Sequence, residues 1–337
     1  PKNYHLIKNE VTPFVPLGLL FLFSQVMSDL YRDSLSEDFL RGWANIILFL
    51  INTVTLFILL DNDKEKFFIF GIGIVVGLIL SYFYSPNIYS QAGLVWKFGY
   101  GYAITFLIAL LTTRSFLQNE LLKSLIFLFL AFLNFYLGFR SLAGISLLVF
   151  IFLTLMKYNT IQKFMYDERS GKSKIFGIFC FFIFSSFLVN YTYTFLVTNS
   201  YLGYDEAIKF QNQSGPLGVL IGGRQELLSS IYAIYQSPII GYGSWAKNPF
   251  SDALLTDLLN QLGYYTPAVS YFGDRIPTHS HIFGSWITAG IFGAFIWLWF
   301  LYKAIKAILI NSINKDNWNS FFYFISILII WHLFFNH

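Results

Sequence analysis

Two histidines separated by a single residue could supply a base in this sequence. His279 and His281 lie in "PTHSHIFGSW" and are two of only five histidines in 337 residues. An imidazole exchanges its proton near neutral pH, so either ring could take a proton from a hydroxyl group. We therefore treat both as candidate catalytic residues. Hydrogen bonding at the start of a helix is the alternative role.

Metal binding is another use of neighbouring histidines, but the rest of the sequence does not favour it. A zinc site needs three or four ligands, and the sequence holds one cysteine, Cys180, and no HExxH motif. A single cysteine also excludes a disulfide within this sequence. We expect neither a metal nor another cofactor.

Arg224 is a candidate for holding an anionic group. It follows Gly222 and Gly223 in "IGGRQELL", directly before a predicted helix. Backbone N–H groups at a helix N-terminus favour an anion, and a guanidinium adds two parallel donors that suit phosphate. We therefore place Arg224 in a set of candidate catalytic and phosphate-binding residues. Pairing with Glu226 or with a lipid headgroup is the alternative.

Two further arginines join this set. Arg140 interrupts an apolar stretch in "FYLGFRSLAGISLL", and a guanidinium at membrane depth usually faces a cavity or a partner. Its alternative is to reach the lipid headgroups from the tip of a hairpin. Arg275 shortly precedes the histidines, and pairing with Asp274 is its alternative.

The elements that position these residues are predicted to lie in a membrane. The chain is 56% hydrophobic and 12% charged, whereas a soluble domain carries about 25% charged residues. Apolar runs of about 17 to 25 residues recur, each long enough to cross a bilayer as a helix. The sequence predicts an all-α polytopic membrane protein whose partners include membrane lipids. A net charge of +4 without a basic run gives no indication of a nucleic-acid partner.

Nine transmembrane helices are predicted, and they divide the chain into three parts. Residues 1–198 hold the first seven helices, residues 199–280 form a long external loop, and residues 281–337 hold the last two. The predicted spans are 11–27, 43–60, 67–84, 92–112, 122–138, 139–157, 174–198, 281–302 and 319–336.

The distribution of positive residues predicts the orientation. With the N-terminus in the cytoplasm, most of the 22 Lys and Arg residues fall on the inner side, led by "KYNTIQKFMYDERSGKSK". This orientation places residues 199–280 outside, as a subdomain lying against the membrane.

The long loop is predicted to be partly helical and to carry no net positive charge. "RQELLSSIYAIYQSP" has apolar residues at helical spacing and ends at Pro238. The loop holds four basic and six acidic residues, so individual arginines would have to bind an anionic substrate. Its many Tyr and Trp residues could stack on sugars, although anchoring at the membrane interface is their commoner role.

Two motif blocks, one within this loop and one at its end, resemble a known family. The first holds Gly223, Arg224, Pro238, Gly241 and Gly243, within "GGRQELLSSIYAIYQSPIIGYGSW". The second, "PTHSHIFGSWITAGIFGAFIW", holds the histidines followed by Gly290 and Gly293, and "FRSLAG" precedes both blocks. In this order they resemble the O-antigen polymerase and O-antigen ligase superfamily of bacterial inner-membrane glycosyltransferases.

The resemblance implies a GT-C-like helical bundle with its active site on the periplasmic face. The implied donor is a polyprenyl-diphosphate-linked oligosaccharide, which is transferred to a sugar hydroxyl with inversion and without a metal. It implies that Arg140 and Arg224 hold the diphosphate and that one of the two histidines is the base. The family often has His-Asn where this chain has His-Ser-His-Ile, so the aligned histidine stays open. The resemblance leaves room for a chain-length regulator protein as a partner.

Two other functions stay open. A ligase would transfer the glycan to lipid A-core instead of another lipid-linked repeat unit, and no residue separates it from a polymerase. A flippase or transporter of lipid-linked sugars is the alternative from another class, for which repeats and matched broken spans would be expected. We favour the polymerase.

Overall fold

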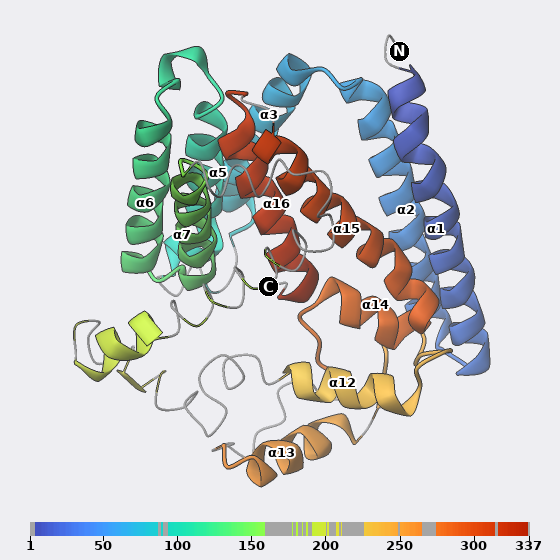
Figure 1. Cartoon of the computed structure of the whole chain (residues 1–337). Coiled ribbons are helices and arrows are strands. Elements are labelled where there is room, and N and C mark those ends of the chain that lie inside the picture. Colours follow the sequence, from blue (N-terminus) through green and yellow to red (C-terminus); the bar gives the residue numbers. More distant parts are fainter. Residues whose placement is uncertain are drawn as a thin grey trace. The chain divides into compact units, whose positions relative to one another are not determined.

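A computed structural model describes most of the chain and is entirely helical there (Figure 1). Among the residues that the structure describes, the only β feature is an isolated bridge between Lys247 and Arg275. The fold class predicted from the sequence, all-α, is therefore confirmed. The described residues are 4–86, 89, 94–158, 177, 180, 184, 187, 191–199, 201, 207–208, 210, 226–248, 250–264, 274–313 and 316–335.

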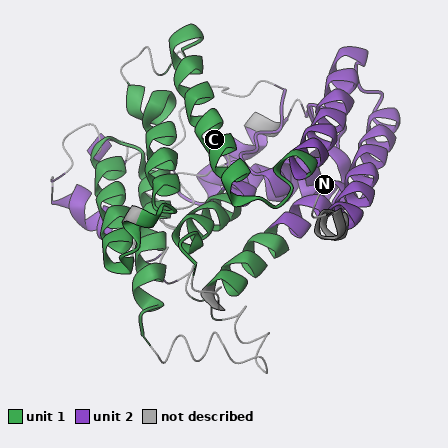
Figure 2. Ribbon diagram, turned by 90° about the horizontal axis from the view of Figure 1, so that it is seen from above, with its two compact units in different colours: residues 1–4, 58–181, 301–331 green, residues 5–57, 182–300, 332–337 purple. Residues whose placement is uncertain are grey.

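The chain divides into two compact units, which Figure 2 colours separately. Unit 1 comprises Pro1–Tyr4, Ile58–Phe181 and Leu301–Trp331. Unit 2 comprises His5–Phe57, Phe182–Phe300 and His332–His337, and it contains both histidines of the predicted site.

Unit 1 is a group of helices with an aromatic core. Its elements include α3 (Lys64–Tyr84), η1 (Trp96–Tyr100), α5 (Gly101–Leu111), η2 (Ser115–Leu117), α6 (Glu120–Tyr136), α7 (Arg140–Leu155) and most of α16 (Asn319–Phe334). The side chains of Asp63 and Asn119 accept backbone N–H bonds and thereby start α3 and α6. The rings of Phe106 and Phe321 meet edge to face at 5.6 Å in the core.

The α6–α7 hairpin confirms the sequence prediction of two adjacent helices around Arg140. The helices pack along one another (Figure 1), and Gly138 turns the chain between them with φ +79°. Arg140 is the first residue of α7 and is partly buried.

Unit 2 is built on α1 (Tyr4–Tyr31) and α2 (Ser36–Leu60). Gly18 of α1 lets Leu50 approach so closely that a Cβ at this position would collide with it. The buried ring of Phe14 contacts Trp299 and Phe300 of α15 (Ile291–Ile313). The unit also holds α12 (Glu226–Gln236), α13 (Ser251–Gln261) and α14 (His281–Ala289).

Four helices in the described part are long and apolar enough to cross a membrane. They are Val11–Tyr31, Ser36–Leu60, Lys64–Tyr84 and Ile291–Asn311. Three shorter apolar helices are Trp96–Leu111, Arg140–Leu155 and Asn319–Phe334. The protein is therefore a helical membrane protein, but the predicted nine spans are not confirmed. The predicted span 174–198 lies mostly outside the described residues.

The predicted continuous span 281–302 is wrong. The chain leaves the helix at Gly290, where φ is +68°, so α14 and α15 are separate helices. A side chain at this position would also collide with the carbonyl oxygen of Ile239. The hydropathy of the sequence could not reveal this break, because it depends on a loop about fifty residues earlier in the chain.

Candidate active site

The candidate site is built on the polar face of α12. Glu226, Ser229 and Ser230 are spaced i, i+3 and i+4, so their side chains share one face of the helix. The hydroxyls of Ser229 and Ser230 both donate to the carbonyl oxygen of Pro277, each at 3.2 Å. These bonds hold the segment that contains His279 against the start of α12.

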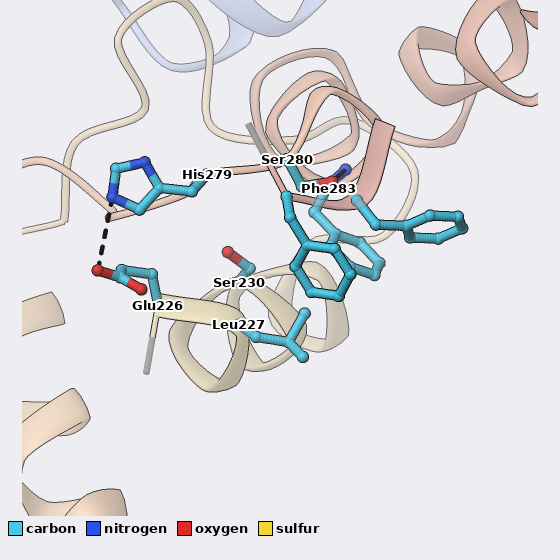
Figure 3. A pocket seen from close by; sticks show the side chains of 8 residues that line it. Glu226, Leu227, Ser230, His279, Ser280 and Phe283 are labelled. Atoms are coloured by element: carbon cyan, nitrogen blue, oxygen red, sulfur yellow. Dashed lines mark hydrogen bonds and ion pairs between the residues drawn. The ribbon is translucent and has the colours of Figure 1, made fainter. Parts of the chain in front are cut away.

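His279 faces Glu226 in this arrangement. The His279 Nε2 atom lies 3.5 Å from Glu226 Oε1. Figure 3 marks this contact with a dashed line. The side chain of His279 is 42% exposed and that of Glu226 is 21% exposed, so the pair is reachable from solvent. A carboxylate beside an imidazole orients the ring, as it does for the histidine bases of known enzymes.

The pair stands beside a small pocket with an apolar side. The pocket encloses about 10 Å³, which is room for about one water molecule. Its lining residues come from α12, the start of α14 and the C-terminal end of α16: Glu226, Leu227, Ser230, His279, Ser280, Phe283, Phe334 and Phe335.

His281 has different surroundings. Its ring stacks on Trp297 with centroids 4.7 Å apart and planes 17° from parallel. It is the first residue of α14, which lies outside the four candidate spans. Burial, and next the charge of nearby His332, lower the pKa of the His281 imidazole, which favours its neutral form.

Ser280 lies between the two histidines and starts α14. Its backbone is extended and its side-chain oxygen accepts a bond from Phe283 N at 3.2 Å, which starts α14. The same hydroxyl donates to the carbonyl of Leu333 at 2.7 Å. His279 therefore lies before the helix and His281 within it, and the two side chains do not converge.

The two predicted glycine blocks interlock through their backbones. Tyr242 N donates to Ile287 O at 2.7 Å, Gly243 N to Thr288 O at 2.9 Å, and Ile291 N to Pro238 O at 3.0 Å. Gly241 and Gly243 have positive φ values, and a Cβ on Gly241 would lie 2.6 Å from Gly290 N. Because these glycines have no side chain, the backbone of the loop can lie close to the backbone at the α14–α15 break.

Gly293 allows α14 and α15 to lie close together at the same break. A Cβ on Gly293 would lie 2.5 Å from the Ser285 carbonyl oxygen and 2.7 Å from the Ala289 Cβ. Gly290 and Gly293 of the second motif block therefore serve the turn between α14 and α15.

Sequence reasoning missed the residues of α1 that hold this loop. Asp29 is 2% exposed, and it accepts bonds from Ser244 N at 2.5 Å, Ser244 Oγ at 2.7 Å and Trp43 Nε1 at 2.9 Å. Ser28 also donates to the carbonyl of Ile240, and Arg32 Nε to that of Gly241 at 2.9 Å.

A signal for this anchor is present in the sequence. The polar residues of "FSQVMSDLYRD" recur at helical spacing at the end of an apolar span: Ser24, Gln25, Ser28, Asp29 and Arg32. A polar face there indicates a buried contact with another segment, because exposing these polar side chains to lipid would cost free energy. Glu226 gave no comparable signal, since its approach to His279 depends on tertiary folding.

The predicted arginines fall in different parts of the chain. Arg224 and Gly223 lie outside the described residues. The backbone of Arg275 forms the isolated β-bridge with the backbone of Lys247. The guanidinium of Arg275 lies 5.9 Å from the centre of the Trp245 ring. Arg140 belongs to unit 1, whereas the His279–Glu226 pair belongs to unit 2.

Comparisons with known proteins add no assignment. No protein-family model matches the chain, and neither a curated protein nor a solved structure matches it significantly.

Proposed function

We propose that the protein is a surface-polysaccharide polymerase of the O-antigen polymerase type. It transfers a polyprenyl-diphosphate-linked glycan to a sugar hydroxyl of another lipid-linked repeat unit, on the periplasmic face of the inner membrane. The observation that carries the proposal is the His279–Glu226 pair at the head of α12, with Nε2 and Oε1 3.5 Å apart. The ordered motif blocks and the membrane-spanning helices support it.

In this proposal His279 is the general base. With Nε2 directed to Glu226, the imidazole Nδ1 is left to accept the proton of the acceptor hydroxyl. The hydroxyl oxygen forms a bond to the anomeric carbon as the bond from that carbon to the diphosphate oxygen breaks. The polyprenyl diphosphate leaves with the electron pair, and Glu226 stabilises the imidazolium.

The leaving diphosphate needs positive charge as it departs. Arg224, two residues before Glu226, is the first candidate to supply it, and Arg275 of the same unit is the other. We assign His281 a structural role at the start of α14, because its ring is stacked on Trp297.

Reconstituted protein supplied with a synthetic polyprenyl-diphosphate-linked repeat unit tests the proposal. Wild-type protein is expected to form a ladder of polymers, and His279→Ala is expected to lose about 100- to 10,000-fold in rate, the usual share of a general base. His281→Phe keeps an aromatic ring for Trp297 and is expected to retain most of the activity.

Each alternative has its own outcome in this assay. Movement of the lipid-linked unit across vesicles without any ladder would favour a transporter. Product formation only on added lipid A-core would favour the ligase. An unchanged ladder from His279→Ala would overturn the proposed base.

A further inference from the structure

The polarity of α12 is reversed relative to an ordinary surface helix. Its buried residues are Ser229, Ser230 and Ala233, whereas Ile231 is 51% exposed and Tyr235 is 79% exposed. A helix between protein and water buries its apolar side chains and exposes its polar ones. Exposure of these large side chains, Ile231 and Tyr235, to water would be unfavourable. We therefore expect them to face an apolar partner.

These side chains line a groove between α12 and α13. The groove has a volume of about 300 Å³ and is lined by Leu228, Ile231, Tyr232, Tyr235, Leu258 and Leu262. Leu228 and Leu262 pack on the cluster of Leu255, Leu259 and Tyr264, which holds the two helices together. No charged side chain among the described residues lines the groove.

The end of α12 is tied to the ends of two membrane spans. Ile291 N, at the start of the α15 span, donates to Pro238 O, two residues after α12. Arg32, directly after the α1 span, donates to Ser237 Oγ at 2.7 Å. The groove therefore belongs to a helix that is anchored at the membrane surface, where Tyr side chains are favoured.

We infer that the groove surface formed by Leu228, Ile231, Tyr232, Tyr235, Leu258 and Leu262 binds the acyl chains of the bilayer lipids. The helix α12 thus lies in the membrane interface, with Ser229 and Ser230 toward the protein and with Ile231, Tyr232 and Tyr235 toward lipid. This arrangement would hold Glu226 and His279 at headgroup depth. The inference rests on the membrane spans and not on the proposed transferase activity.

Site-directed spin labelling of the full chain in phospholipid nanodiscs tests the inference. Cys180 is the only cysteine, so Cys180→Ser provides a background for Ile231→Cys and, at a second site, Tyr235→Cys. Leu48→Cys, at a 54% exposed position within the α2 span, is the lipid reference. Asp257→Cys, at an exposed acidic position of α13, is the aqueous reference.

Collision rates with oxygen and with a water-soluble nickel chelate give the answer. Labels at 231 and 235 are expected to resemble the label at 48, with an oxygen-to-nickel ratio several-fold above that at 257. A ratio like that at 257 would overturn the inference. Low collision rates with both reagents would overturn it too, because they would show that protein covers the groove.

Discussion

At the scale of residues, two histidines of similar sequence context have different surroundings. His279 lies before α14 and faces a carboxylate, whereas His281 lies inside α14 against Trp297. The residue between them, Ser280, is the N-cap of α14. A base must be reachable by its substrate and oriented by a partner, and His279 meets both conditions.

Glu226→Gln tests the partner of the proposed base, His279. The substitution keeps the size of the side chain but removes the charge that stabilises an imidazolium. We expect turnover to fall by about 10-fold or more, yet by less than for His279→Ala, with normal membrane insertion. Glu37→Gln, at an exposed acid at the start of α2, is the matched control. Equal activity of the two variants in the polymerisation assay would contradict the pairing.

Asp29→Ala tests the anchor of the glycine loop. The change leaves the backbone N–H of Ser244, its hydroxyl and the indole N–H of Trp43 without their acceptor. We expect a loss of about 3 kcal/mol or more in the free energy of unfolding, since each buried orphan donor costs about 1 to 3 kcal/mol. Thermal denaturation in detergent measures it, and Glu37→Ala should melt like the wild type. A melting temperature equal to that control would show that the network contributes no stability.

At the scale of elements, helix breaks decide where the site lies. Gly290 separates α14 from α15, and the loop after α12 packs its backbone into that break. The helix α12 was predicted from its apolar spacing. The helix α13 was not, although Leu254, Leu255, Leu258, Leu259 and Leu262 recur at helical spacing and could have revealed it.

Gly290→Ala tests the interlock of loop and break. Alanine would be strained at φ +68°, and its Cβ would collide with the Ile239 carbonyl, so we expect a clearly lower melting temperature. Gly77→Ala is the matched control, because it lies in α3 with nothing within 4 Å of its added Cβ. It should be neutral or slightly stabilising. If both variants melt alike, the positive φ at 290 is not required.

At the scale of the whole molecule, the protein is a helical membrane protein with at least four helices able to cross a bilayer. The positive-inside distribution predicts that its N-terminus is cytoplasmic and that the α1–α2 connection is periplasmic. The site and the α12 surface belong to the long segment that this orientation places outside.

Cysteine labelling in intact cells tests the orientation. In the Cys180→Ser background, Glu37→Cys is expected to react with an impermeant maleimide added from the outside. Glu65→Cys, at the start of α3, is expected to react only after the cells are opened. The reverse pattern would place the proposed site in the cytoplasm and would contradict a periplasmic polymerase.

The sequence by itself determined the class of the protein, because apolar runs of span length can be satisfied only in a membrane or a large core. It also predicted that the helix of the long loop ends at Pro238, and it placed Gly241, Gly243 and Gly290 in two motif blocks without revealing their backbone geometry. Only the tertiary structure decided that these glycines meet, that Asp29 holds their loop, and that His279 rather than His281 faces a carboxylate. Those facts depend on contacts between residues about 50 to 215 positions apart, which local patterns do not encode.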